Sequence, residues 1–484
     1  MDLSLDGAIV EEGASVGTVV GTFGSSDPDS VGALDFELAN DTSGFFEIVG
    51  NELRVKTGAT IDFEASGSHE VVVRAIDDRG LSLERSFTVD VQDRAADGEF
   101  VFSELDGVSG FVLNGVDAYD RSGRSVSSAG DVNGDGFDDL IIGARLADPQ
   151  NNPSAGESYV VFGGAGVGTG GSVDLSALDG TNGFVLHGIG VYDYTGYSVS
   201  SAGDVNGDGI DDLIISAHGA DPNGDGDAGA SYVVFGGAGV GGSGSFDLSG
   251  LNGTNGFVLN GIDPSDFSGS SVSSAGDVNG DGIDDLIIGA RYSDPNGSDS
   301  GESYVVFGGA GVGGGGSVDL SALDGTNGFV LSGIDTRDYS GFSVSSAGDM
   351  NGDGIGDLII GARRADPNGI SSAGESYIVF GGQNFGAVFE LSNLAAGNGS
   401  TGFVLNGIGM NSDSGTSVSS AGDVNGDGFD DLIVGARFAD PNGIGDAGEA
   451  YVVFGGADVT GGSGSIELSS LNGLNGFSLS GIDE

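Results

Sequence analysis

The chain has 484 residues, 73 acidic side chains against 14 basic ones, a formal net charge of −59 and no cysteine. The length predicts at least two domains, the charge excludes nucleic acid and anionic membrane surfaces as partners, and the lack of cysteine excludes disulfides. The 98 glycines do not indicate disorder, because apolar residues make up 38% of the chain and fall in short runs that can build a core.

Residues 1–95 are predicted to form a separate β-sandwich. They contain alternating apolar and polar strands, for example at 70–75 and 86–91, and lack the repeat found in the rest of the chain. The polar stretch 92–98 is the predicted linker. Residues 1–4 lack the charged and apolar regions of a secretory signal, and no run reaches the roughly 20 apolar residues of a membrane span.

Residues 96–484 carry an internal repeat with a period of about 73 residues. Each unit has short apolar strands, as at 110–113, 125–130, 140–143 and 157–164, and no helical periodicity. The apolar runs do not alternate with polar residues, which indicates burial on both faces. Four strands per repeat predict the blades of a β-propeller, so the predicted fold class is all-β, a sandwich followed by a propeller.

The array has five full repeats and a partial sixth. The Phe-x-Leu strand occurs six times, the last at Phe477, whereas the acidic loop occurs five times. Either the last strand closes a ring against the first unit or the ring is truncated, and the sequence leaves both possibilities open. We expect the chain to be a fragment of a larger protein.

Each repeat contains an acidic loop of the form Asp-x-Asn-x-Asp-Gly-x-x-Asp. Side chains at positions 1, 3, 5 and 9, with the main-chain carbonyl of position 7, give oxygen ligands only, which favours calcium over zinc or copper. Position 12 is Ile142 in the first loop, so the loop is not a helix–loop–helix calcium hand, whose twelfth residue is Glu. The predicted ligands are Asp131, Asn133, Asp135, Phe137, Asp139, Asp204, Asn206, Asp208, Ile210, Asp212, Asp277, Asn279, Asp281, Ile283, Asp285, Asp349, Asn351, Asp353, Ile355, Asp357, Asp423, Asn425, Asp427, Phe429 and Asp431.

Position 8 is Asp in four copies but Gly356 in the fourth, so we expect it to add negative field or solvation and to be dispensable. The alternative, that the loops are only surface turns, is disfavoured because five copies keep the same ligand types. We expect about five calcium ions that are structural, since each loop joins two strands of one blade beside no obvious nucleophile or base.

The motifs of the repeat resemble a known family. The segments 125–136, 139–144 and 159–164 read SVSSAGDVNGDG, DLIIGA and YVVFGG, which is similar to the FG-GAP repeat, the blade of the integrin alpha N-terminal propeller. The resemblance implies a calcium-stabilised propeller. Integrin propellers have seven blades and a Gly-Ala-Pro motif, which is Gly-Ala-Arg here, so integrin-type ligand recognition is not carried over. The close similarity of the repeats suggests a large secreted or surface bacterial protein.

The N-terminal segment resembles a cadherin repeat more weakly. Its landmarks are Glu12 with 16–18, 27–29, 62–64 and 75–77. The resemblance implies further calcium ligands at Glu12, Asp62, Glu64 and Asp93, although the family's Asn-Asp-Asn linker is missing.

Both resemblances imply an extracellular or cell-surface adhesion or scaffold module without enzymatic activity. The expected partner is an unidentified surface protein or glycan, and neither nucleic acid binding nor direct membrane insertion is expected. We expect no secretion signal or membrane anchor within this chain. The alternative is a propeller that accompanies a secreted hydrolase of the phospholipase type. His187 and His218 break the repeat symmetry but are interpreted as drift, and the recurring arginines are expected to pair with loop Asp residues. The variable Asp-Pro loops are better candidates for partner contact.

Overall fold

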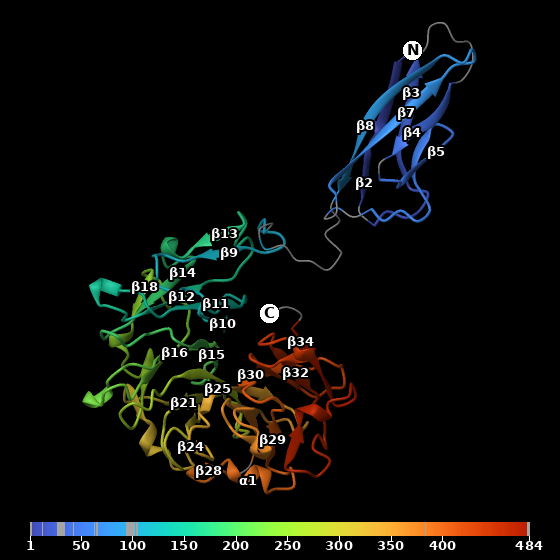
Figure 1. Cartoon of the computed structure of the whole chain (residues 1–484). Helices are drawn as coiled ribbons and strands as arrows, with labels where there is room; N and C mark the ends of the chain where they lie inside the picture. The colour runs from blue at the N-terminus through green and yellow to red at the C-terminus, as the bar shows by residue number, and fades with distance from the viewer. Residues whose placement is uncertain are drawn as a thin grey trace. The chain divides into compact units, whose positions relative to one another are not determined.

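The computed structural model describes residues 2–11, 13–26, 34–41, 43–61, 63, 66–92, 102, 105–382 and 384–481. It confirms the all-β fold class and divides the chain into two compact units, Met1–Glu104 and Leu105–Glu484 (Figure 1). The predicted linker 92–98 falls, apart from Gln92, outside the described residues. Among the described residues, no helix has the length and apolar character needed to span a membrane.

The N-terminal unit consists of two four-stranded sheets. One has the order β1 (Asp2–Gly7), β3 (Val19–Ser26), β6 (Glu52–Val55) and β5 (Phe46–Val49); the other has the order β2 (Ile9–Glu11), β8 (Ser82–Gln92), β7 (Ser68–Ile76) and β4 (Asp35–Asp41). Val71, Val73 and Ala75 alternate along β7 with more exposed residues and are fully buried. They belong to one core cluster with Leu3 and Leu53 of the other sheet, as expected for a sandwich.

The C-terminal unit contains five antiparallel four-stranded blades. Their strands are β10 (Ser125–Gly130), β11 (Asp139–Ala144), β12 (Glu157–Val161) and β14 (Gly183–His187) in blade 1; β15 (Val199–Gly203), β16 (Asp212–Ala217), β17 (Ala230–Val234) and β19 (Gly256–Asn260) in blade 2; β20 (Ser271–Gly276), β21 (Asp285–Ala290), β22 (Glu302–Val306) and β24 (Gly328–Ser332) in blade 3; β25 (Ser340–Gly348), β26 (Asp357–Ala362), β27 (Glu375–Val379) and β29 (Gly402–Asn406) in blade 4; and β30 (Ser414–Gly422), β31 (Asp431–Ala436), β32 (Glu449–Val453) and β34 (Gly476–Ser480) in blade 5.

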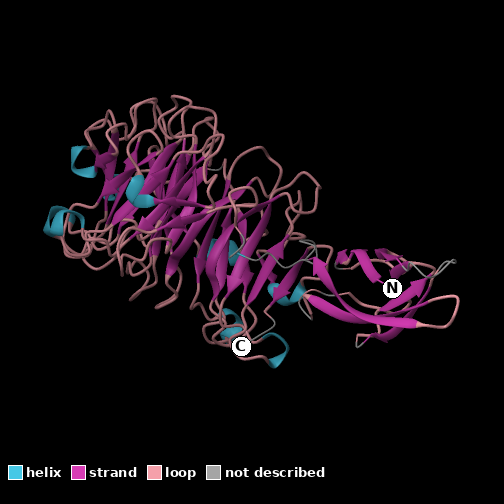
Figure 2. Cartoon of the chain, turned by 90° about the horizontal axis from the view of Figure 1, so that it is seen from above, coloured by secondary structure: helices cyan, strands magenta, loops and turns pink. Residues whose placement is uncertain are grey.

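Short strands from the linkers join neighbouring blades. The strands β18 (Ser245–Asp247), β23 (Ser317–Asp319), β28 (Val388–Glu390) and β33 (Ser465–Glu467) pair in parallel with the last strand of the preceding blade, and β13 (Ser172–Asp174) pairs likewise with β9 (Val112–Asn114). Among the described residues, the helical turns lie in connections between strands (Figure 2): η2 (Pro149–Asn151), η3 (Leu175–Ala177), η4 (Pro222–Gly224), η5 (Leu248–Gly250), η6 (Leu320–Ala322), η7 (Pro367–Gly369), α1 (Ser392–Ala395), η8 (Pro441–Gly443) and η9 (Leu468–Ser470). The sequence pattern did not predict these parallel strands, which are three residues long.

Consecutive blades pack face to face, so the non-alternating apolar runs are buried on both sides. Ile141 and Val160 of blade 1 belong to one buried cluster with Leu213 and Ile215 of blade 2. Equivalent clusters bring blade 2 against blade 3, blade 3 against blade 4, and blade 4 against blade 5. Each blade therefore depends on its neighbours for its core, as expected of a repeat array.

The two ends of the array remain open. Val126 of blade 1 is 63% exposed, whereas Val199, at the same repeat position in blade 2, is 4% exposed. At the other end, Leu479 of β34 is 53% exposed. No strand of blade 5 pairs with blade 1 in the part of the chain that the structure describes, and the blades form an arc (Figure 1). The last strand therefore does not close a five-bladed ring.

Candidate functional site

Each acidic loop connects the first two strands of a blade. In blade 1, β10 and β11 are antiparallel, and their register shifts between Ser128 and Gly130, which is a β-bulge next to the loop. Gly130 has a φ of +70°, a left-handed conformation that glycine adopts without strain. The same shift occurs in the other four blades. The bulge thus directs all five loops, which begin at the following Asp, to the same end of the blades.

The first Asp of each loop organises the turn. Oδ1 of Asp131 accepts hydrogen bonds from the amides of Gly134 (2.9 Å) and Asp135 (3.0 Å), and Oδ2 accepts one from Gly136 (2.8 Å). The other four loops repeat this pattern. The pattern explains why an Asp is required at position 1, since its carboxylate bonds three main-chain donors of the loop.

The ninth Asp is fully buried below the loop. Oδ2 of Asp139 accepts the amide of Val132 (3.1 Å) and Oδ1 accepts the amide of Gly163 (2.7 Å). Burial raises its pKa to about 6, and the charges of Asp135 and Asp131 add to the shift despite these hydrogen bonds. Burial likewise raises the pKa values of Asp212, Asp285 and Asp357 to about 7.

The remaining predicted ligands lie around this buried carboxylate. Asn279 at position 3 places its Nδ2 3.4 Å from Oδ1 of Asp285, and Asn133 has a buried Oδ1 without a hydrogen-bond donor. The fifth Asp is exposed and accepts the amide of residue 7, as Asp135 does from Phe137 at 3.0 Å. Among the described residues, no three carboxylate or imidazole groups are gathered closely enough to hold a metal ion as they stand.

The donor set nevertheless suits a hard cation. It is made of oxygen ligands only, it includes an orphaned buried amide oxygen at Asn133, and it places a buried carboxylate beside two others of like charge. The role of each residue as a ligand stays a prediction.

The eighth Asp has a role that the sequence analysis missed. Oδ2 of Asp211 in blade 2 accepts the amide of Asp131 in blade 1 at 2.9 Å, so it joins one loop to the next. Asp284 and Asp430 make the same bond to Asp204 (3.0 Å) and Asp349 (2.8 Å). The expectation that position 8 only adds field or solvation is therefore wrong. In the fourth repeat, Gly356 lacks this carboxylate, and its amide donates to the carbonyl of Asp277 at 2.9 Å, as the amide of Asp430 also does to the carbonyl of Asp349 at 3.2 Å.

The repeated arginines follow strand two at the opposite end of the blades. Two of them pair with a loop Asp as expected, because Arg363 and Arg437 lie 3.1 Å and 3.3 Å from the carboxylate of Asp413. In contrast, the guanidinium of Arg145 lies 5.3 Å from the ring centre of Tyr197, and that of Arg291 lies 4.9 Å from the ring centre of Tyr292. Pairing with Asp thus describes blades 4 and 5 only.

One of the symmetry-breaking histidines has a structural partner. Nδ1 of His187 lies 2.8 Å from Oε1 of Glu157 on the neighbouring strand. The hydrogen bond to Glu157 raises the pKa of His187 against the opposing effect of burial.

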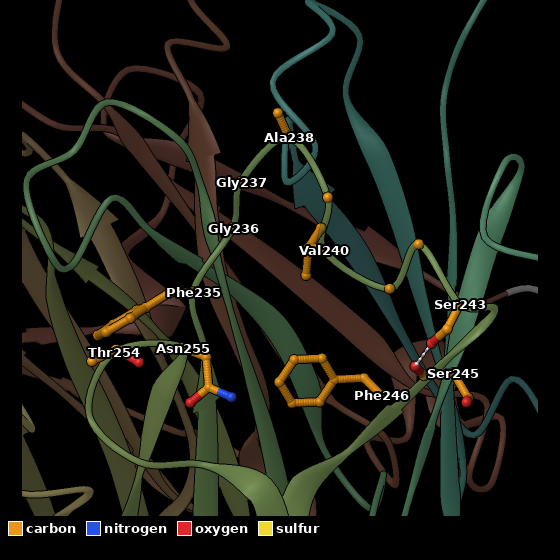
Figure 3. A pocket seen from close by; sticks show the side chains of 13 residues that line it. Phe235, Gly236, Gly237, Ala238, Val240, Ser243, Ser245, Phe246, Thr254 and Asn255 are labelled. Atoms are coloured by element: carbon orange, nitrogen blue, oxygen red, sulfur yellow. Dashed lines mark hydrogen bonds between the residues drawn. The ribbon is translucent and has the colours of Figure 1, made fainter.

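A cavity of 680 Å³ lies at the glycine-rich linker after β17 (Figure 3). It is lined by main chain of 236–242 and by Phe235, Val240 and Phe246, and Oγ of Ser243 donates to the carbonyl of Ser245 at 2.9 Å. None of its lining residues is acidic, basic or histidine. This cavity therefore offers no general acid or base.

The calcium ligands implied for the N-terminal domain fall outside the part of the chain that the structure describes. Glu12, Asp62, Glu64 and Asp93 all lie outside the described residues, as do 27–29.

Comparison with known proteins supports both resemblances. The FG-GAP repeat family matches residues 122–161, 195–234, 268–306, 340–379 and 414–453, and the cadherin domain family matches residues 7–92. Integrin alpha-5 of Xenopus laevis is 28% identical over 248 residues, which cover 50% of this chain and 20% of the relative. Integrin alpha-PS2 of Drosophila melanogaster is 28% identical over 252 residues, which cover 51% of this chain and 15% of the relative. The chain thus spans a fifth or less of these relatives.

Among solved structures, PcdhgB3 EC1-4 is 26% identical over 19% of this chain and 24% of its own, with a TM-score of 0.17. Drosophila N-cadherin EC1-3 is 23% identical over 18% of this chain and 30% of its own, with a TM-score of 0.16. The repeated loops, the blades and the two family matches agree: the chain consists of an N-terminal cadherin domain and five FG-GAP repeats that build a propeller.

Proposed function

We propose that this chain is a calcium-stabilised adhesion module in which each of the five acidic loops holds one structural calcium ion. The observation that carries the proposal is the buried ninth Asp. Asp139, Asp212, Asp285 and Asp357 each lie within the loop's negative field, and none of them has an ion pair with a basic side chain in the described structure. A divalent cation would offset both burial and repulsion.

The side chains at positions 1, 3, 5 and 9 and the carbonyl at position 7 would hold the ion. In the first loop these are Asp131, Asn133, Asp135, Asp139 and the carbonyl of Phe137. The bound ion would supply the positive charge that the loop lacks and would connect the first two strands of the blade. Because loops of neighbouring blades are bonded through position 8, calcium in one loop would also favour order in the next.

Function as an adhesion module rests on the domains. FG-GAP repeats and cadherin domains point to an extracellular adhesion-type module, and integrin alpha-like and cadherin families are non-enzymatic. Extracellular calcium, at millimolar levels, would load even sites of modest affinity. We propose a surface protein or glycan as the partner, contacted through the variable Asp-Pro loops on the rigid array.

Calorimetry tests the calcium proposal. Each site is expected to stabilise the fold by about 1.4 kcal/mol when free calcium is tenfold above its Kd, so Tm should rise with calcium and fall with chelator. Asp208→Ala, which removes an exposed ligand at position 5 of the second loop, should reduce the number of bound ions by one. Asp225→Asn, in the Asp-Pro loop of the same blade, should leave that number unchanged. Melting that is indifferent to both calcium and chelator would refute the proposal.

A further inference from the structure

Departures from the repeat gather at one place in the array. The residue just before the Ser-Val-Ser-Ser-Ala-Gly motif of strand one differs in every blade, and the residue after strand two is Arg in every blade except the second. These two positions are occupied by Arg124 and Arg145 in blade 1, Tyr197 and His218 in blade 2, Ser270 and Arg291 in blade 3, Phe342 and Arg363 in blade 4, and Thr416 and Arg437 in blade 5. In an array of near-identical units, such departures are where a specific ligand site is expected.

The structure brings four of these side chains together. The ring of His218 lies 3.9 Å from the ring of Tyr197, measured between centroids, and the guanidinium of Arg145 lies 5.3 Å from the centre of the Tyr197 ring. Arg291 donates from Nη1 to the hydroxyl of Tyr197 at 3.3 Å. Three consecutive blades therefore meet at Tyr197, at the end opposite the acidic loops.

The basic side chains of the propeller lie at this end, together with the acidic Asp-Pro loops that follow strand two. All eight basic side chains of residues 105–484 are arginines, and all belong to the segments before strand one or after strand two. They are Arg121, Arg124, Arg145, Arg291, Arg337, Arg363, Arg364 and Arg437. A chain with a net charge of −59 thus places the cations of its propeller at the end where Tyr197 lies.

Several buried nitrogen atoms in this cluster have no hydrogen-bond partner. In the described structure, the Nε atoms of Arg145 and Arg291 are buried without an acceptor, and neither residue has an ion pair. His218 is 7% exposed, and its Nδ1 also lacks a partner. An unsatisfied buried donor is unfavourable, and more so on a charged group, so these atoms favour an incoming acceptor.

The local electrostatic field is positive. Burial acts to raise the pKa of Tyr197, yet the charge and hydrogen bond of Arg291 and the charges of Arg124 and Arg145 bring it below its ordinary value. Burial, together with Arg291 and Arg145, lowers the pKa of His218 to about 3, so this imidazole is neutral at pH 7 and able to donate one proton in a hydrogen bond. A bound anion would be attracted by these arginines.

We propose that Arg145, Tyr197, His218 and Arg291 form a binding site for the carboxylate group of a small acidic ligand. A guanidinium that stacks on an aromatic ring keeps its N–H donors in its own plane, where a carboxylate accepts two of them. Arg145 and Arg291 are only half-buried, so a ligand reaches them from solvent. Acidic sugars and aliphatic acids present the same group, and the experiment separates them.

Isothermal titration calorimetry of the calcium-loaded chain with D-glucuronate tests the site, with glucose as the neutral control and glutarate as the acyclic acid. Saturable binding of glucuronate or glutarate, but not of glucose, is expected. Stronger binding of glucuronate would identify the ligand class as acidic sugars, and stronger binding of glutarate would identify it as aliphatic acids. Arg145→Gln or Arg291→Gln should weaken binding about tenfold or more. Arg437→Gln, at the same repeat position but paired with Asp413, should leave the affinity unchanged.

Two results would overturn the site: absence of saturable binding by either acid, or an equal loss of affinity in Arg437→Gln. Inorganic phosphate that binds more tightly than both acids would also overturn the assignment to a carboxylate. A measurement that needs no variant is the spectrum of ¹⁵N-labelled arginine side chains. Glucuronate or glutarate should shift two Nε–H resonances strongly, and uniform small shifts would contradict the proposal.

Discussion

Replacement of Asp211 by Ala tests whether neighbouring loops are bonded through position 8. The carboxylate of Asp211 accepts the amide of Asp131 at 2.9 Å and packs against Gly130, where a Cβ atom would collide with it. A hydrogen bond to a charged group contributes about 1.5–3 kcal/mol, and its loss leaves a half-buried amide without an acceptor. We therefore expect Asp211→Ala to reduce the free energy of unfolding by about 1–2 kcal/mol.

The repeat supplies its own controls. Asp138 occupies position 8 of the first loop, but it is exposed, and the described structure gives its carboxylate no amide of a preceding loop to accept. Asp138→Ala should therefore change stability by less than about 0.5 kcal/mol. Gly356 occupies the same position in the fourth loop. A Cβ atom there would lie 3.3 Å from the amide nitrogen of Asp277, and the backbone of Gly356 is not left-handed. Gly356→Asp should therefore add the missing bond and slow the exchange of the Asp277 amide.

Urea denaturation measures the stabilities, and hydrogen exchange at the Asp131 amide reports the bond itself. Protection of this amide should fall in Asp211→Ala and persist in Asp138→Ala. Equal destabilisation by the two variants would refute the reasoning, because it would show that the loss of a loop carboxylate, rather than a bond between blades, determines the effect. Unchanged protection of the Asp131 amide in Asp211→Ala would refute it as well.

Two further predictions concern other parts of the propeller. Val199 is 4% exposed, so Val199→Asp should reduce the free energy of unfolding by about 3 kcal/mol or more. Val126, at the same position in blade 1, is 63% exposed, so Val126→Asp should reduce it by less than about 0.5 kcal/mol, as measured by urea denaturation. Similar losses in the two variants would show that the end of the arc is covered in solution. Burial, followed by the charges of Glu375 and Asp335, raises the pKa of Asp338 to about 7. Its proton is therefore bound more tightly in the folded state, and the stability it contributes is present at low pH and lost as pH rises through about 7. Asp338→Asn should reduce the pH dependence between 5 and 8 by about 2–4 kcal/mol, and an unchanged pH slope would contradict this.

The sequence predicted the parts of the fold that depend on local pattern. Short apolar runs such as 140–143 do not alternate, and blade-to-blade packing buries them on both faces, which is the outcome that pattern predicts. The parallel strands of the linkers were not foreseen, because three residues such as Ser172–Asp174 carry no periodic signal. The open arc was one of two possibilities that the sequence left undecided, because identical repeats give identical local signals whether or not their ends meet.

The loop chemistry was predicted in type but not in its connections. The alternation of Asp and Asn indicated oxygen ligands, and the structure places the ninth Asp in a buried position under the loop. The partner of position 8 lies 80 residues earlier in the chain, so no spacing within one loop reveals it. In the fourth repeat, which has Gly356 at this position, a main-chain bond to Asp277 is present, and blade 5 makes the equivalent bond from Asp430 to Asp349 beside its carboxylate bond.

Repetition also separates what maintains the fold from what serves a ligand. Features shared by all five blades, such as the first and ninth Asp of each loop, have main-chain partners in every blade and are explained by folding and by the proposed calcium sites. His218 has no such explanation, since its ring replaces an arginine that recurs in the other blades and its Nδ1 lacks a partner. A histidine that had only drifted would be expected at the surface, where an unpaired nitrogen meets water. Its burial beside Tyr197 and two arginines that have no ion pair in the described structure supports the proposed carboxylate site at this end of the propeller, opposite the acidic loops that are proposed to bind calcium.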